Sequence, residues 1–206
     1  MKIKLRKYQP SDFKSLENII RKTWNYDQFS SPQVSQKLAK VFLSSCLTNY
    51  TFSRVAIIDD KPVGIILGKN CSSHKCSLKN RFMQIKAILS LYATKEGRNV
   101  SKIFSSVSDI DKQLLKECHK TYPGELALFA IDSSCRGKGI GKLLFQEVLN
   151  YFQQQKLNEF YLFTDTSCNY GFYEHQGMKR RHEKEHTFCI NQQNKKMNFF
   201  IYDYHF

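Results

Sequence analysis

The chain has 206 residues and a formal net charge of +14, with 41% hydrophobic and 14% aromatic residues. That much apolar and aromatic material excludes a disordered chain and suits a domain with a substantial core. No apolar run approaches the ~20 residues needed to cross a bilayer, the start does not resemble a secretory signal, and seven scattered cysteines indicate reduced thiols. We therefore expect a soluble, cytoplasmic protein without a membrane partner, either a monomer or a homodimer.

The first seventy residues predict a strand, two helices and a hairpin. Apolar and basic residues alternate over 3–8, which is typical of an edge strand. Apolar residues recur at helical spacing over 13–24 and 34–47, after start signals at Pro10–Asp12 and at Ser31-Pro32. Two apolar runs at 54–58 and 63–67 flank an Asp-Asp-Lys-Pro turn and predict a β-hairpin.

Residues 71–122 interrupt this pattern with two helical candidates, around 78–94 and 103–119, which we expect to be joined near Gly97. The stretch contains ten Lys and Arg against four Asp and Glu, a net charge of +6. About 50 residues would form a poor independent core. We therefore expect a basic helical insertion within a single domain that spans residues 1–206.

The order of elements after Pro123-Gly124 predicts an α/β fold. A buried strand at 125–131 precedes a glycine loop, and an amphipathic helix follows at 143–152. A second buried strand at 160–163, a short helix at 170–175 and an aromatic strand at 198–206 complete the chain. This order favours a mixed, strongly twisted sheet flanked by helices.

The glycine loop reads Arg136-Gly137-Lys138-Gly139-Ile140-Gly141 and lies between a strand and a helix. Glycine lets the backbone approach a ligand closely, and a helix N-terminus offers unpaired N–H groups and a positive dipole end to phosphate oxygens. A P-loop needs Ser or Thr after Gly141-Lys142, where Leu143 stands, and a dinucleotide loop needs Gly-x-Gly-x-x-Gly spacing. Both of these nucleotide-binding patterns therefore fail.

The arrangement Arg-x-x-Gly-x-Gly resembles the acetyl-coenzyme A loop of the GNAT N-acetyltransferase superfamily. The run from 164 to 178 is similar to the second signature of that family, with Asn169 and Tyr173 at matching positions and Met178 in place of the usual Phe. The spacing of four predicts that Asn169 and Tyr173 share one face of a helix. The resemblance covers most of the chain and is strongest over 125–178.

The resemblance implies a GNAT-like fold and a set of residues that bind acetyl-coenzyme A (acetyl-CoA). In the family, a bulged strand pairs with the pantetheine arm of the coenzyme, and the loop holds the pyrophosphate. The Asn of the second signature also holds the pantetheine arm. By that analogy the binding residues are Phe129, Ala130 and Ile131 in the strand, Arg136, Gly137, Lys138, Gly139, Ile140, Gly141 and Lys142 in the loop, and Asn169.

The resemblance also implies two catalytic residues. Tyr173 would protonate the departing thiolate. Glu125 precedes Arg136 by eleven residues, the spacing at which the histone-acetylating branch places its glutamate base. An amine must lose its proton before it attacks a thioester, so Glu125 would accept that proton directly or through water. Many family members use other residues or only water, so this match does not fix a histone-like substrate.

The implied reaction is direct transfer of an acetyl group from acetyl-CoA to a primary amine of a small molecule or protein, in a ternary complex. It needs no metal and no covalent enzyme intermediate, although Cys135 and Cys168 flank the expected site. We expect the insertion at 71–122 to lie over the acceptor side. The alternative is a non-catalytic acyl-CoA-binding or RNA-associated protein of the same fold.

Two metal-like patterns compete with this interpretation. The run His182-Glu183-Lys184-Glu185-His186 satisfies the zinc-peptidase pattern H-E-x-x-H, which requires a helix. It lies in a charged segment between two strand-like stretches, so we expect a solvated strand or hairpin. Cys71, His74 and Cys76 supply three soft ligands without a matching second half, so we expect a loop there and no metal. The charge leaves nucleic-acid binding open, but no motif supports it.

Overall fold

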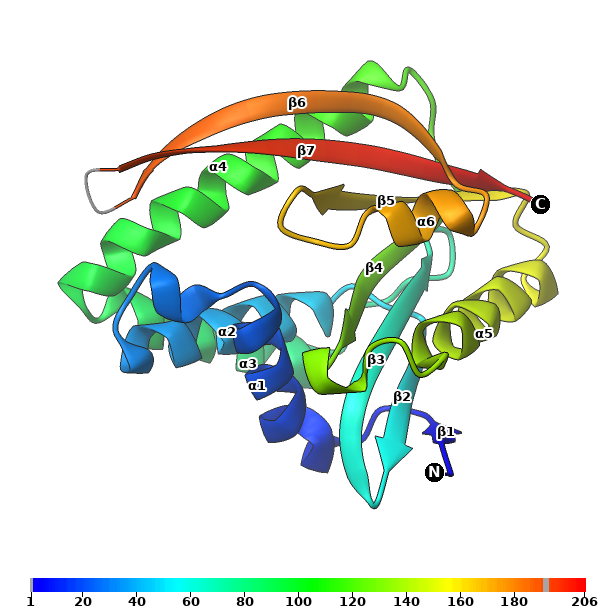
Figure 1. Cartoon of the computed structure of the whole chain (residues 1–206), viewed down its shortest axis with the longest axis horizontal. Coiled ribbons are helices and arrows are strands. Elements are labelled where there is room, and N and C mark those ends of the chain that lie inside the picture. Colours follow the sequence, from blue (N-terminus) through cyan, green and yellow to red (C-terminus); the bar gives the residue numbers. More distant parts are fainter. Residues whose placement is uncertain (1, 191–192) are drawn as a thin grey trace.

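The computed structural model describes residues 2–190 and 193–206, and its strands form a seven-stranded sheet in the order β1-β2-β3-β4-β5-β7-β6. Neighbouring strands are antiparallel except β4 and β5, which are parallel. The strands are β1 (Lys4–Arg6), β2 (Phe52–Ile58), β3 (Lys61–Asn70), β4 (Gly124–Ile131), β5 (Glu159–Asp165), β6 (Lys179–Ile190) and β7 (Gln193–His205). The predicted mixed, twisted sheet flanked by helices is confirmed (Figure 1).

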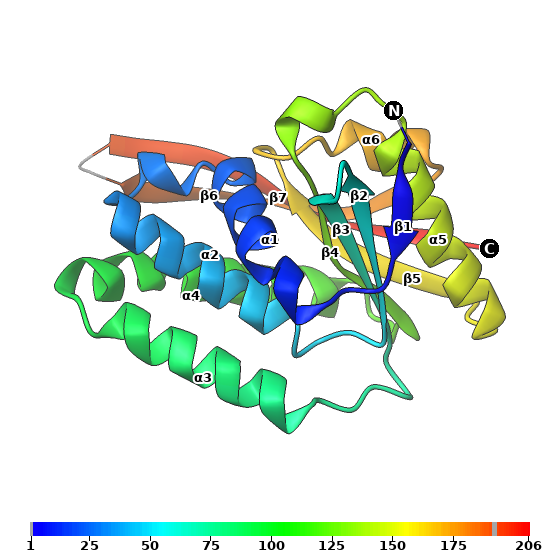
Figure 2. The ribbon, with the colours of Figure 1, turned by 90° about the horizontal axis from the view of Figure 1, so that it is seen from below.

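Six α-helices of the described chain surround the sheet: α1 (Phe13–Thr23), α2 (Pro32–Cys46), α3 (Leu78–Tyr92), α4 (Lys95–Glu117), α5 (Ile140–Gln154) and α6 (Gly171–His175). Helices α1 and α2 lie on one side of strands β2 to β4, and α5 lies on the other (Figure 2). No described helix combines the length and the apolar composition that a membrane span requires.

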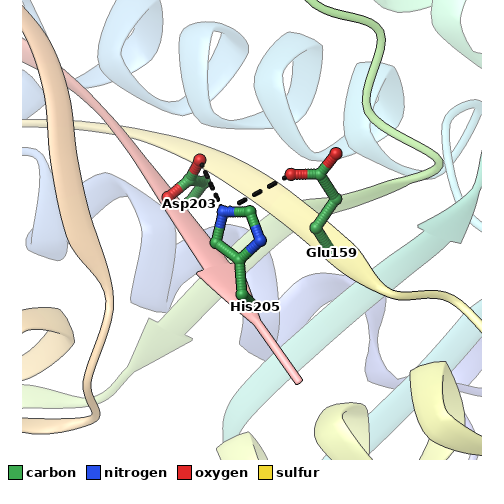
Figure 3. Close-up of side chains that lie close together, drawn as sticks. All are labelled: Glu159, Asp203 and His205. Atoms are coloured by element: carbon green, nitrogen blue, oxygen red, sulfur yellow. Dashed lines mark hydrogen bonds and ion pairs between the residues drawn. The ribbon is translucent and has the colours of Figure 1, made fainter.

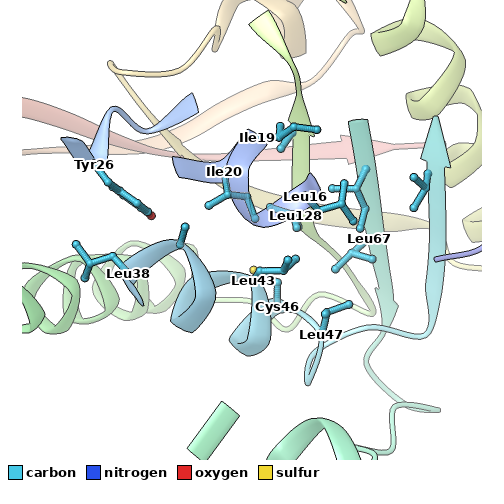
Figure 4. Packing of buried hydrophobic residues seen from close by; sticks show 14 of the residues in the cluster. Leu16, Ile19, Ile20, Tyr26, Leu38, Leu43, Cys46, Leu47, Leu67 and Leu128 are labelled. Carbon is cyan, nitrogen blue, oxygen red and sulfur yellow. The ribbon is translucent and has the colours of Figure 1, made fainter. Parts of the chain in front are cut away.

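Apolar side chains at helical spacing on α1 and α2 build the first part of the core. Leu16 and Ile20 of α1 and Leu38 and Leu43 of α2 are almost fully buried and belong to one cluster with Leu67 of β3 (Figure 4). On the other face, a second cluster packs α5 against the sheet through its apolar stripe. The two clusters together fix the position of β4, which lies between them.

Helix α4 runs beneath the long β6–β7 arm (Figure 1). Its Ile110 and Leu114 are buried against Phe199 and Ile201 of β7, which makes a third apolar cluster. Helix α3 lies outside α2 and α4 (Figure 2). The segment between β3 and β4 is therefore helical, as the sequence predicts.

The boundary between α3 and α4 differs from the prediction. Helix α4 begins at Lys95 rather than near 103, and Gly97 lies inside its first turn. Thr94 caps this helix, since its Oγ1 accepts a hydrogen bond from the Gly97 N–H at 3.1 Å. A Cβ at Gly97 would lie 2.1 Å from the carbonyl oxygen of Leu91. Gly97 therefore permits a tight corner between the helices and does not separate them.

The sheet opens between β4 and β5. Their pairing comprises Gly124 with Phe160 and Glu125 with Tyr161, after which the strands diverge (Figure 1). A register shift against β3 makes Ala127 a bulge, because Leu67 pairs with Leu128 while Gly68 pairs with Leu126. A bulge bends its strand and increases the local twist. The sheet thus consists of two halves, β1–β4 and β5–β7, joined at one end.

Candidate functional site

A cavity of about 380 Å³ lies beside the diverging strands. It is lined by β4, the end of β5, the glycine loop, the start of α5, and residues of α1, α2 and α6. The lining residues that the sequence predicts are Phe129, Ala130, Ile131, Arg136, Gly137, Gly139, Ile140, Gly141, Lys142, Asn169 and Tyr173. Of the predicted site residues, Glu125 and Lys138 do not belong to this lining.

The open edge of β4 presents backbone groups to the cavity. The N–H of Asp132 donates to the carbonyl of Val63 on β3 at 2.8 Å. Because backbone groups alternate along a strand, those of Ala130 also point to β3, and those of Phe129 and Ile131 point to the open side. An extended ligand could pair with these two residues as an added strand would. Ala130 also belongs to the cavity lining, but its backbone groups point to β3 and are not offered to such a ligand.

The glycine loop has a backbone conformation that favours glycine. Gly137 and Gly139 have φ angles of 75° and 77°, and among the described residues no atom lies within 4 Å of where their Cβ atoms would be. Gly139 caps α5, so the N–H groups of the first turn lack acceptors within the helix. These groups and the helix dipole make the cavity end of α5 suitable for an anion.

Basic side chains surround the same end of the cavity. Arg136, Lys138 and Lys142 are exposed around the loop, and Arg136 and Lys142 line the cavity itself. Gly141 sits closer to its neighbours, since a Cβ there would lie 3.3 Å from the Phe172 ring. The first turn of α5 therefore packs on α6 while its basic side chains stay free to contact a ligand.

Asn169 and Tyr173 both reach the cavity, but they do not share a helix. Helix α6 begins at Gly171, so Asn169 lies in the preceding turn, where its carbonyl accepts a hydrogen bond from the Phe172 N–H at 3.2 Å. The expectation of one common helix face is wrong for this reason. Tyr173 is 9% exposed, and burial raises the pKa of its phenol. Tyr173 therefore stays protonated at neutral pH.

Glu125 lies just outside the cavity lining, where β4 still pairs with β5. Its carboxylate accepts hydrogen bonds from the Asn49 amide at 3.1 and 3.2 Å and forms an ion pair with Lys69 at 3.3 Å. Its side chain is 14% exposed. Burial and the nearby Glu125 charge raise the pKa of Tyr161, which stands opposite on β5. Asn49 and Lys69 thus fix the Glu125 carboxylate at the point where β4 and β5 begin to separate.

Two further carboxylates, on other elements, belong to the surroundings of this end of the sheet, because Asp111 is close enough to Asp165 and to Glu125 for both charges to act on it. Asp111 comes from α4 and Asp165 from the end of β5. Burial, followed by the charges of Asp165 and Glu125, raises the pKa of Asp111 to about 7. Asp111 and Asp165 were not predicted as site residues, because acidic residues far apart in the chain give no local signal that they will meet. Negative charge therefore gathers around Asp111.

The two cysteines that flank the site, Cys135 and Cys168, line the cavity. Burial and the charge of Asp165 raise the pKa of Cys168 to about 11. A nucleophilic cysteine needs a lowered pKa, because the thiolate is the reactive form. The surroundings of Cys168 thus favour a packing role over covalent catalysis.

The H-E-x-x-H run lies in strand β6, as expected, and not in a helix. Positions four residues apart in a strand are roughly 13 Å apart, too far for two imidazoles to share one ion. In the other pattern, His74 Nε2 lies 2.9 Å from the carbonyl oxygen of Thr48. That ring nitrogen is therefore already engaged.

A different group of side chains comprises Glu159, Asp203 and His205, whose potential metal-ligand atoms lie within 4.8 Å of one another (Figure 3). Lys120 contacts Glu159 at 2.6 Å and Asp203 at 3.0 Å, and Arg181 contacts Asp203 at 2.8 Å. Burial alone would raise the pKa of Asp203, but the hydrogen bonds from Arg181 and Lys120 hold it below its usual range. The carboxylates thus have cationic partners, and the group is an ion-pair network linking β5, β6 and β7.

A mixed sheet that opens beside a glycine-rich helix N-terminus defines the acetyltransferase class of α/β fold. The sequence model of the Acetyltransferase (GNAT) family matches residues 13–178, which is more than half of the chain. The chain belongs to this family. No curated protein is detectably similar to it in sequence.

Solved structures share the fold along nearly the whole chain. An N-acetyltransferase from Staphylococcus aureus Mu50 is 12% identical, with 100% of this chain and 99% of that chain covered and a TM-score of 0.57. Smu.2055 from Streptococcus mutans UA159 is 18% identical, with 98% of both chains covered and a TM-score of 0.56. PaiA N-acetyltransferase from Thermoplasma acidophilum, in complex with coenzyme A, is 15% identical, with 100% of both covered and a TM-score of 0.50.

Proposed function

We propose that this protein transfers an acetyl group from acetyl-CoA to a primary amine. The observation that carries the proposal is the open edge of β4 beside the N-terminus of α5. Few ligands combine an extended, amide-containing arm with a pyrophosphate, and the two features lie where such a ligand needs them. The PaiA N-acetyltransferase, which shares the fold, was solved in complex with coenzyme A.

The residues around the cavity fit acetyl-CoA part by part. Backbone groups of Phe129 and Ile131 face the position of the pantetheine arm, and Asn169 lies across the opening from them. The donors at the start of α5, together with Arg136 and Lys142, suit the pyrophosphate. Acetyl-CoA supplies an acetyl group activated as a thioester.

The protein's own groups provide what transfer of that acetyl group needs. A backbone N–H on the open edge of β4 stabilises negative charge that develops on the carbonyl oxygen. Tyr173 stays protonated because burial raises its pKa, so it can donate a proton to the leaving sulfur. Glu125 lies outside the cavity lining and is held by Lys69, so we propose that it accepts the amine proton through water.

The distribution of charge favours a cationic acceptor. The charges of Asp165 and Glu125 act on Asp111 of α4, whereas the exposed basic side chains of the glycine loop lie at the end of the cavity that suits the pyrophosphate. An amine that carries a second positive charge, such as a diamine or the lysine of a basic peptide, would offset the mutual repulsion of these carboxylates. We therefore propose that such amines are preferred over neutral ones.

Release of coenzyme A, measured by chromatography over a panel of monoamines, diamines and lysine peptides, tests the proposal. We expect turnover with acetyl-CoA, and we expect Tyr173→Phe to lower kcat by roughly 10²-fold with little change in KM. Tyr170→Phe is the matched control, because Tyr170 precedes α6 and does not belong to the cavity lining. Coenzyme A binding without turnover of any amine would leave only the non-catalytic alternative.

The same assay across pH tests Glu125. We expect Glu125→Gln to lower kcat/KM most at neutral pH, and the deficit to shrink as rising pH deprotonates the amine itself. An identical pH profile for Glu125→Gln and the unmodified enzyme would remove Glu125 from the proton path.

A further inference from the structure

The outer face of helix α3 carries a row of exposed apolar side chains. Seven large apolar side chains of the described residues are exposed, and five of them lie on this one helix. Their exposed fractions range from 48% to 89%. The five, which we call the α3 seam, are Leu78, Phe82, Ile85, Leu89 and Tyr92. They leave on the order of 500 Å² of apolar side chain exposed, near the upper limit for a monomer surface.

The opposite face of α3 is already packed against the protein. Ala87 and Leu91 are buried, and the Asn80 amide donates to the Leu47 carbonyl at 2.7 Å. Gln84 donates to Ser45 Oγ of α2 at 3.0 Å. The helix is therefore packed against the protein on one face and leaves its row of large apolar side chains uncovered on the other. Within the described residues, the rest of the chain covers only the inner face of α3.

The spacing of the α3 seam indicates the shape of its cover. Successive members are four, three, four and three residues apart, which is the a/d pattern of a helix that packs against another helix. On a helical wheel at 100° per residue the seam is about 80° wide, narrower than the face of at least ~100° that is typical of broader amphipathic packing. This geometry favours a single helix over a flat surface such as a membrane.

Charge decides which kind of helix fits. The positions beside the seam hold Lys79, Arg81 and Lys86, all exposed, and α3 contains no acidic residue. A second copy of the chain would bring these three cations against their own counterparts, and each copy has a net charge of +14. Like charges beside an a/d seam oppose pairing, whereas opposite charges specify it. Self-association through this face is thus disfavoured.

We propose that the α3 seam docks an acidic amphipathic helix of another protein. The partner helix places apolar residues at a/d spacing on the seam and Asp or Glu residues beside Lys79, Arg81 and Lys86. The proposal is independent of acetyl transfer, because α3 contributes nothing to the cavity lining.

A designed peptide tests the proposal on the full-length protein. The probe is a fluorescent helical peptide of four heptads, with Leu at a and d and Glu at e and g, and its binding is followed by anisotropy. We expect saturable binding that weakens as salt rises. We expect the double variant Phe82→Ser/Leu89→Ser to weaken peptide binding at least 10-fold. The charge reversal Lys79→Glu/Arg81→Glu/Lys86→Glu should weaken binding of this peptide by at least 10-fold as well. It should also create affinity for a peptide with Lys in place of Glu at e and g.

Both sets of changes lie on exposed positions, and Phe206→Ser is the matched control, since it removes an exposed aromatic group from the far end of the chain. Circular dichroism and the melting temperature verify folding. Three results would overturn the proposal: no peptide binding, equal binding by all variants, or seam-dependent binding only to vesicles of phosphatidylcholine with 30% phosphatidylserine. Sedimentation that shows a dimer abolished by Phe82→Ser/Leu89→Ser would assign the seam to a second copy instead.

Discussion

Asp111 is a single side chain whose charge is unfavourable in the folded protein. It projects from α4 toward Asp165 and Glu125, and burial together with these charges raises its pKa to about 7. Its ionised form is therefore less favourable in the folded protein than in the unfolded chain. Carboxylates whose pKa values are raised by burial and by neighbouring carboxylates cluster at functional sites, where a bound cation can relieve the repulsion between the negative charges.

We expect Asp111→Asn to stabilise the protein at neutral and alkaline pH. Folding raises the pKa of Asp111 from about 4 to about 7. In the protein without the substitution, the free energy of unfolding is therefore undiminished by Asp111 below about pH 4, and it falls as pH rises from there through about 7. The variant should gain at most about 4 kcal/mol above pH 7 and nothing near pH 4. Denaturant unfolding across pH measures this, with Asp109→Asn as the exposed control on the same helix. A gain that does not depend on pH would contradict the assignment.

Individual residues also show where sequence reasoning reaches its limit. Tyr173 could be placed at the site from the sequence, because its neighbours in the chain carry a recognisable signature and the cavity includes it. Asp111 and Asp165 could not, because 54 residues separate them and only the crossing of α4 over the sheet brings them together. The bulge at Ala127 was implied by resemblance alone, since nothing in the run 125–131 marks it locally.

At the scale of elements, the glycine loop and α5 depend on one backbone conformation. Gly139 caps the helix with a φ of 77°, a region in which a residue with a Cβ is strained. Gly177 has a φ of 85° but lies after α6, outside the cavity lining. A Cβ would strain the backbone at both glycines, but only Gly139 lines the cavity.

We expect Gly139→Ala and Gly177→Ala to lower stability similarly, by about 1–2 kcal/mol each. Only Gly139→Ala should also weaken coenzyme A binding, by at least 10-fold, because its Cβ and the shifted first turn of α5 obstruct the phosphate position. Thermal denaturation and isothermal titration calorimetry separate the two effects. Equal affinities for coenzyme A in both variants would show that the loop does not hold the pyrophosphate.

Most elements were predictable from local patterns, and the exceptions have physical causes. The hairpin of β2 and β3 follows from its apolar runs and from Asp59 and Asp60, whose positive φ values suit a two-residue turn. The start of α4 was missed because the cap at Thr94 and the close approach of Gly97 to Leu91 depend on how α3 packs. From the sequence alone, Gly97 is easily taken for a residue that ends a helix, although it lies in the first turn of α4.

At the scale of the whole molecule, charge is unevenly placed. The protein carries +14 overall, and its basic loop surrounds the end of the cavity that suits an anion. The carboxylates at the other end form a small acidic region in a basic protein. If the proposed function holds, a field of this kind would raise the local concentration of acetyl-CoA, and the carboxylates would attract the proposed cationic acceptor.

The divergence of β4 from β5 also leaves the sheet without continuous hydrogen bonding across its middle. In solution, the amide hydrogens of Phe129 and Ile131 should exchange with deuterium quickly, whereas that of Ala130, which points to β3, should exchange slowly. Saturating coenzyme A should slow exchange at Phe129 and Ile131 and leave Ala130 unchanged, as nuclear magnetic resonance can record residue by residue. Unaltered exchange at the first two amides would mean that the arm does not pair with β4. If they do slow, the donor acts as an eighth strand, and the sheet becomes continuous only while the enzyme is loaded.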